Sequence, residues 1–128
     1  MGKYGEVAEL AVSLMGQDNS LTPREAWREA AARVFPDSRT ARAKGCPKDS
    51  FLTLCETGSM EHVEAGAYTR SIRNKRYITR ALAALRTEPR LADDPKRLWL
   101  IATDGAAVTP NHQIDVLTAL WRRGLIRK

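Results

Sequence analysis

Apolar residues recur along the chain at intervals of three and four, which is the spacing of one face of an α-helix. The clearest stripes are Val7, Leu10, Ala11 and Leu14; Trp27, Ala30, Ala31 and Val34; Ile78, Ala81, Leu82 and Leu85; and Ile114, Leu117, Leu120 and Trp121. No stretch alternates apolar and polar residues as a well-defined strand would. The pattern therefore predicts a helical protein.

Capping and helix-breaking residues between the stripes predict where the helices begin and end. Thr22-Pro23-Arg24-Glu25 is typical of a capping box with proline in the first turn. Gly124 followed by Leu125-Ile126 is typical of a Schellman ending. The expected helices are about Gly5–Met15, Thr22 to before Pro36, Ser38–Lys44, Pro47–Thr57, Thr69–Thr87, Pro95 to before Gly105, and Thr109 to before Gly124. In the sixth of these we expect Leu98 and Ile101 to face inward, with Trp99 as a further candidate.

These elements predict an all-α fold, a compact bundle of six or seven short helices in a single domain spanning residues 1–128. A chain of 128 residues is long enough to bury a hydrophobic core of its own. The polar segment Met60–Ala67 fits either an irregular loop or a small hairpin near residue 63.

The net charge of +6 is concentrated in one segment. Residues 68–90 hold seven basic side chains against the single acid Glu88, so this segment carries the whole net charge. Such a concentration is the electrostatic footprint expected of a surface that binds an anionic partner.

A helical wheel places the basic residues of this segment opposite its apolar stripe. Arg70, Arg73, Arg76 and Arg80 fall together on one side, Tyr77 lies at the edge of their arc, and Lys75 adds a further cation. Arginine suits phosphate because its planar fork binds two oxygens at once. The row predicts contact with a nucleic-acid backbone, with an acidic protein surface as the alternative. A solvated face without a partner would give the same pattern.

Residues 38–57 also allow a helix-turn-helix, because two predicted helices flank a short turn that contains Gly45. In that arrangement Lys48, Asp49, Ser50 and Thr53 would face a DNA groove, and Lys44 at the turn would contact phosphate. The second helix is poor in Arg, Asn and Gln, so we expect backbone contact rather than sequence reading.

Cys46 is the candidate nucleophile for a second alternative, a thiol-dependent enzyme. It lies near a predicted helix N-terminus, where the helix dipole and neighbouring lysines favour a thiolate. His62 or His112 could supply the base that thiol catalysis needs, although their spacing gives no indication of it. A small residue that merely begins a helix explains Cys46 more simply. Capping and exposure likewise explain the polar cluster Asn111, His112, Gln113 and Asp115.

Several classes of protein are not indicated. The chain has no apolar run of about 18 residues that could span a membrane and no secretory leader, so we expect a cytoplasmic protein. Two cysteines and two histidines without ligand spacing predict no metal site. No nucleotide-binding or hydrolase motif occurs, so no cofactor is expected.

Several short motifs are spread along the chain: Lys44-Gly45-Cys46-Pro47-Lys48, Phe51-Leu52, Leu54-Cys55-Glu56, Tyr68-Thr69-Arg70-Ser71, Asn74-Lys75, Gln113, Asp115-Val116, Ala119-Leu120-Trp121 and Gly124-Leu125-Ile126. In these residues the chain resembles a group of small uncharacterised bacterial proteins. The resemblance implies a bacterial or phage source and a single full-length domain, and it carries no assigned activity.

Overall fold

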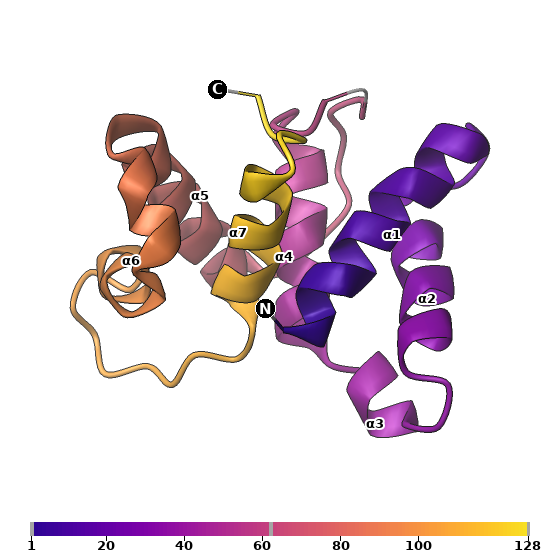
Figure 1. The fold of residues 1–128 in the computed structure, drawn as a ribbon, viewed down its shortest axis with the longest axis horizontal. Helices are drawn as coiled ribbons and strands as arrows, with labels where there is room; N and C mark the ends of the chain where they lie inside the picture. The colour runs from indigo at the N-terminus through magenta and orange to yellow at the C-terminus, as the bar shows by residue number, and fades with distance from the viewer. Residues whose placement is uncertain (1, 62, 128) are drawn as a thin grey trace.

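A computed structural model describes residues 2–61 and 63–127, and the all-α prediction is confirmed (Figure 1). The elements in chain order are α1 (Lys3–Gln17), α2 (Pro23–Val34), α3 (Arg39–Arg42), α4 (Gly45–Glu56), α5 (Ile72–Thr87), the 3-10 helix η1 (Pro89–Asp93), α6 (Pro95–Ala102) and α7 (Gln113–Arg122). In Figure 1, α1 and α2 lie on one side, α4 and α7 in the middle, and α5 and α6 on the other side.

The predicted caps fix the ends of two helices. Thr22 accepts a hydrogen bond from the backbone N–H of Glu25, whose carboxylate accepts one from the N–H of Thr22, so the capping box is present. Gly124, with φ of 70°, donates to the carbonyl of Trp121, and the N–H of Leu125 donates to that of Leu120. This pair of bonds is the predicted Schellman motif.

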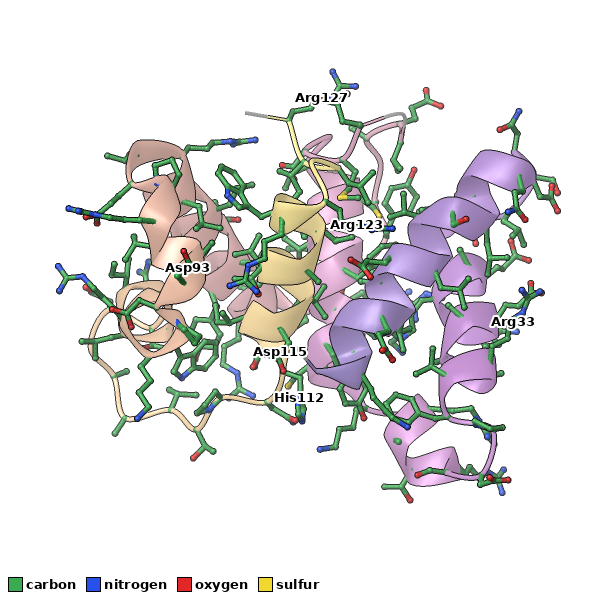
Figure 2. The ribbon with its side chains drawn as sticks, in the orientation of Figure 1. Arg33, Asp93, His112, Asp115, Arg123 and Arg127 are labelled. Carbon is green, nitrogen blue, oxygen red and sulfur yellow. The ribbon has the colours of Figure 1, made fainter. Side chains whose placement is uncertain are left out.

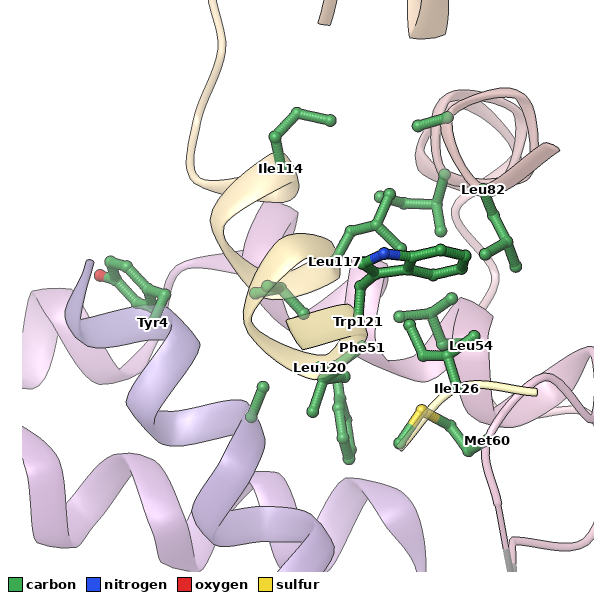
Figure 3. Packing of buried hydrophobic residues seen from close by; sticks show 14 of the residues in the cluster. Tyr4, Phe51, Leu54, Met60, Leu82, Ile114, Leu117, Leu120, Trp121 and Ile126 are labelled. Atoms are coloured by element: carbon green, nitrogen blue, oxygen red, sulfur yellow. The ribbon is translucent and has the colours of Figure 1, made fainter. Parts of the chain in front are cut away.

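The core lies around α4 and α7, as Figure 3 shows. Phe51, Leu54, Leu117 and Leu120 are fully buried, and Trp121 packs beside them. The α5 stripe of Ile78, Ala81, Leu82 and Leu85 is buried as predicted. Burial of such side chains contributes roughly 1.5–3 kcal/mol each, which makes this shared core the main source of stability.

The predicted helix-turn-helix is wrong, because α4 is an internal helix. Ser50 and Thr53 were expected to face a groove, yet both are buried and their hydroxyls donate to the carbonyls of Cys46 and Asp49 at 2.8 Å. The preceding α3 is a single turn, and Gly45 begins α4 instead of lying between the helices. Helix α4 therefore has no open face with which to read a groove.

The segment near residue 63 does not form a hairpin in the part of the chain that the structure describes. Met60 instead forms an antiparallel bridge with Ile126, and the N–H of Glu61 donates to the carbonyl of Leu125. Both Met60 and Ile126 are buried. The C-terminal segment therefore forms the backbone hydrogen bonds that the second strand of a hairpin would have formed.

Two helices begin later than predicted. Helix α5 begins at Ile72 and not at Thr69, because Ser71 caps it by accepting from the N–H of Asn74. Helix α7 begins at Gln113 because His112 has a left-handed backbone, with φ of 68°, which interrupts the helical path.

In α6 the inward face also differs from the prediction. Ile101 was expected inside but is 36% exposed, whereas Trp99 and Leu98 are buried. No helix in the described residues is both long and apolar enough to cross a lipid bilayer.

Candidate functional site

Helix α5, the basic helix, is held at its N-terminal end by one carboxylate on α4. Oε1 of Glu56 accepts from the backbone N–H groups of Tyr68 and Thr69 at 2.8 and 3.1 Å. Its Oε2 lies 2.7 Å from Nζ of Lys75, and the Glu56 side chain is only 15% exposed. Burial raises the pKa of Glu56, but the bonds from Lys75, Thr69 and Tyr68 outweigh it and leave the pKa below its usual value.

Lys75 is therefore bound within the fold. It was predicted as one of the cations available to a partner, but its ammonium group is half-buried and directed at Glu56. On a helical wheel of α5, Lys75 lies beside the buried stripe and away from the arginines. This position explains why Lys75 faces α4 and not solvent. Lys75 anchors α5 and does not belong to the open row.

The predicted arginines do form an open row. Arg70, Arg73 and Arg76 are exposed, and they make no hydrogen bond or ion pair with any part of the chain that the structure describes. Arg80 is also exposed, and its one side-chain hydrogen bond within the described residues is a long one of 3.5 Å to the carbonyl of Ala102. Arg70 precedes the helix, in the segment that Glu56 holds, while the other three lie on α5.

Tyr77 was expected beside these arginines at the surface, but it is only 8% exposed. Its ring meets the indole of Trp99 edge-on, with 5.3 Å between the ring centroids. Helix α6 covers this edge of α5, which a wheel of α5 alone cannot reveal. Tyr77 is therefore a core residue and is removed from the site.

Lys44 and Lys48 do not extend the row. Nζ of Lys44 donates to Oδ1 of Asn111 at 3.3 Å, which ties the start of α4 to the start of α7. Lys48 is half-buried in the second turn of α4. Both lie at the N-terminal end of α4 and not on α5.

The structure also exposes large apolar side chains on α5 and α6 that were not predicted as part of the site. Ile72 is 72% exposed, and Leu100 and Ile101 on α6 are 58% and 36% exposed. On the wheel Ile72 lies about 40° from Arg76, so its position on the basic side was readable from the sequence. Helix α6 packs on α5, and a shallow groove that contains Arg80, Ala83 and Ile101 runs between them.

Within the described residues, no side-chain hydrogen bond joins the Cys46 thiol to a base. Cys46 is half-buried in the first turn of α4 and makes no side-chain hydrogen bond within the described residues. His62 lies outside those residues. His112 bonds through Nδ1 to Oδ2 of Asp115 at 3.0 Å, and Figure 2 shows these two side chains together at the start of α7.

Gln113, from the same predicted polar cluster, is buried. Its Oε1 accepts from the backbone N–H of Asn111 at 2.6 Å, and its Nε2 donates to Oδ1 of Asn74 at 3.4 Å. Gln113 therefore joins α7 to α5. Among the described residues, no three His, Cys, Asp or Glu side chains converge in a way that could hold a metal ion.

No curated protein and no solved structure matches this chain. The model of one protein family matches residues 1–127, which confirms the resemblance to a group of small proteins without an assigned activity; their bacterial source stays an expectation. The chain therefore belongs to the family of unknown function DUF6979.

Proposed function

We propose that the outer face of α5 binds the phosphate backbone of a nucleic acid. The observation that carries this proposal is the row of Arg70, Arg73 and Arg76, three exposed guanidinium groups without partners in the described chain. Each can donate two parallel hydrogen bonds to phosphate oxygens. Along α5, Arg73, Arg76 and Arg80 are spaced by roughly 4.5 and 6 Å, so long side chains can reach neighbouring phosphates.

The stability of α5 does not explain why arginines occupy these positions. Arg73 lies in the first turn of α5 and Arg70 just before it. The positive end of the helix dipole disfavours cations there by a few tenths of a kcal/mol. An anionic partner would reverse this cost, because it would meet the dipole and the arginines together.

Binding of this kind is expected to be insensitive to base sequence. Bases are read best by Arg, Asn and Gln placed against their edges in a groove. The amides nearest this face, Asn74 and Gln113, are buried and bonded to each other. The face offers arginines, which bind phosphates as well as base edges, and the short side chains of Thr79 and Ala83, with no amide beside them. We therefore expect phosphate contact to dominate.

The test is a fluorescence-anisotropy titration of a labelled duplex and a single strand of equal length at two salt concentrations. Wild-type protein is expected to bind both, and each phosphate contact should steepen the dependence of log K on log salt by about 0.7–0.9. The double variant Arg73→Glu/Arg76→Glu should abolish salt-sensitive binding. The single variants Arg73→Glu and Arg76→Glu should each weaken it. Arg28→Glu, the same charge change as either single variant at an exposed site on α2, is their control and should reduce affinity far less. Absence of salt-sensitive binding by the wild type at low salt would refute the proposal.

An acidic protein partner is the second candidate, and the exposed Ile72, Leu100 and Ile101 favour it. Protein interfaces combine a central apolar patch with arginines, whereas backbone phosphates offer no apolar surface. Ile72→Ser separates the two candidates. It should weaken capture of a protein partner strongly and leave nucleic-acid affinity nearly unchanged. A partner still captured by the Arg73→Glu variant would argue against the acidic-protein candidate.

A further inference from the structure

A second concave site lies away from the arginine row, between the start of α6, the loop before α7 and the start of α7. Its volume is about 450 Å³, within the range of small-molecule pockets. Four apolar residues, Pro95, Trp99, Pro110 and Ile114, form its walls. No residue of α5 lines it, so this inference does not depend on the proposed function.

The apolar wall is fixed by contacts outside the pocket. Nε1 of Trp99 donates to the carbonyl of Val108 at 2.7 Å, and its ring packs edge-on against Tyr77. The same bond holds the loop that carries Pro110. Two proline rings and a locked indole leave this wall little freedom to lose when a ligand binds, and their faces can pack against a flat ring.

Three polar side chains line the same pocket: Lys96, His112 and Asp115. Asp115 holds Nδ1 of His112 at 3.0 Å, and the histidine ring lies 4.7 Å from the ring of Tyr4 between centroids. Nε2 of His112 and Nζ of Lys96 have no hydrogen-bond or ion-pair partner among the described residues. The carboxylate fixes the orientation of the imidazole, while Nε2 stays available to a ligand.

His112 also has a left-handed backbone, with φ of 68°. A residue other than glycine is uncommon in this region and persists where surrounding contacts hold it. The ring contact with Tyr4 and the bond to Asp115 are such contacts. The strain therefore coincides with the side chain that is aimed at the pocket.

We propose that this pocket binds a planar aromatic carboxylic acid that also carries a ring hydroxyl or N–H group. The ring would lie against Trp99 and the prolines, the carboxylate would pair with Lys96, and the hydroxyl would donate to Nε2 of His112 when Nδ1 carries the proton. A nonplanar acid would lack the apolar contact, and a neutral ester would lack the ion pair.

The test uses 6-hydroxy-2-naphthoate, its methyl ester and 4-hydroxycyclohexanecarboxylate, each titrated into the ¹⁵N-labelled chain and followed by amide and indole NMR shifts. The naphthoate should shift the signals of the Trp99 indole and of the backbone amides of residues 111–115, with a Kd of about 1 mM or tighter. The ester should bind several-fold more weakly, and the cyclohexane acid should not shift these signals.

Matched variants connect binding to the named groups. His112→Gly removes the ring but tolerates the left-handed backbone, and Lys96→Ala removes the cation; each should weaken naphthoate binding at least several-fold. Two control variants should leave naphthoate binding unchanged. Asp104→Gly changes the other residue besides glycine that has a left-handed backbone in the described chain, and Arg97→Ala changes the residue next to Lys96, which does not line the pocket. No shift at the amides of residues 111–115 up to about 5 mM, well above the expected Kd, would overturn the proposal. Equal affinity in His112→Gly and wild type would overturn it too.

Discussion

Nζ of Lys75 lies 2.7 Å from Oε2 of Glu56, and this ion pair attaches the basic helix to the buried helix α4. The same carboxylate accepts two backbone hydrogen bonds from the segment that precedes α5. The inner cation of α5 is thus neutralised, while Arg73 and Arg76 on its outer side keep their charge open to solvent. One acid therefore determines which cations of this helix can meet a partner.

Replacing Glu56 by glutamine should lower the free energy of unfolding by about 1–2 kcal/mol at pH 7. The amide oxygen can still accept from Tyr68 and Thr69, but the charge opposite Lys75 is lost. Because the pKa of Glu56 is lowered from 4.5 in the folded state, its contribution is fully present above that pH and is lost as pH falls through the lowered value. Urea unfolding at pH 7 and pH 3 measures both effects.

The control for this prediction is Glu64→Gln, an exposed acid in the neighbouring loop whose carboxylate makes no bond within the described residues. It should change stability by less than about 0.5 kcal/mol. A wild-type advantage over Glu56→Gln that is equally large at pH 3 would show that the carboxylate charge is not the cause.

The elements that local sequence determines were predicted well. The α5 stripe from Ile78 to Leu85 and the capping box of Thr22 and Glu25 depend on residues within one or two helical turns. The errors arose where distant residues decide. Tyr77 is covered by α6, and Met60 pairs with Ile126, which no local pattern encodes.

Within the site, the exposure of the arginines was predictable from the helical wheel. Whether acidic side chains pair with them was not. Glu56 lies on α4, apart from α5 in sequence, and only the fold shows that it forms an ion pair with Lys75. The pocket beside Trp99 likewise combines α6, a loop and α7. No spacing within one segment could have indicated it.

Two glycines of α1 should respond in opposite ways to alanine. A Cβ on Gly5 would lie 2.8 Å from Cβ of Ala119 on α7, too close for either backbone to accommodate without a shift. Gly5→Ala should therefore destabilise the protein by about 1–3 kcal/mol. Gly16 has no atom within 4 Å of the added carbon, so Gly16→Ala should stabilise it by about 0.5 kcal/mol through helix propensity.

Thermal or urea unfolding of the two variants checks this contrast, with each glycine serving as the control for the other. Equal effects of the two substitutions would show that helix propensity, and not the close approach of α1 and α7, decides both.

The two cysteines should differ sharply in reactivity. Cys55 is fully buried, and burial raises the pKa of its thiol to about 12. Iodoacetamide should therefore modify the half-buried Cys46 in the native protein, and Cys55 only after unfolding. Mass spectrometry before and after denaturation counts the modified thiols, and Cys46→Ser should abolish the native reaction. If Cys46 reacts no faster at pH 6 than a free thiol peptide does, the thiol-enzyme hypothesis loses its support.

Arg76→Glu should leave the protein as stable as the wild type, or more stable by about 0.5 kcal/mol, although it removes a residue of the proposed binding face. Arg73 and Arg80 lie three and four residues away on α5, and like charges at this spacing repel. An acid at position 76 would attract both. Arg28→Glu gives the contrast. The hydrogen bonds with Thr22 are the main cause of the lowered pKa of Glu25, and the charge of Arg28 adds to it, so reversing that charge should destabilise slightly.

Urea unfolding at low and high salt separates these charge effects, since salt should bring both variants closer to the wild type. A loss of more than about 1 kcal/mol in Arg76→Glu would exceed what a solvated surface charge contributes, and Arg76 would then have a role within the fold. A gain in stability combined with lost anion binding would mean that the arginine row opposes folding slightly, so that its presence is explained by a partner and not by the stability of α5.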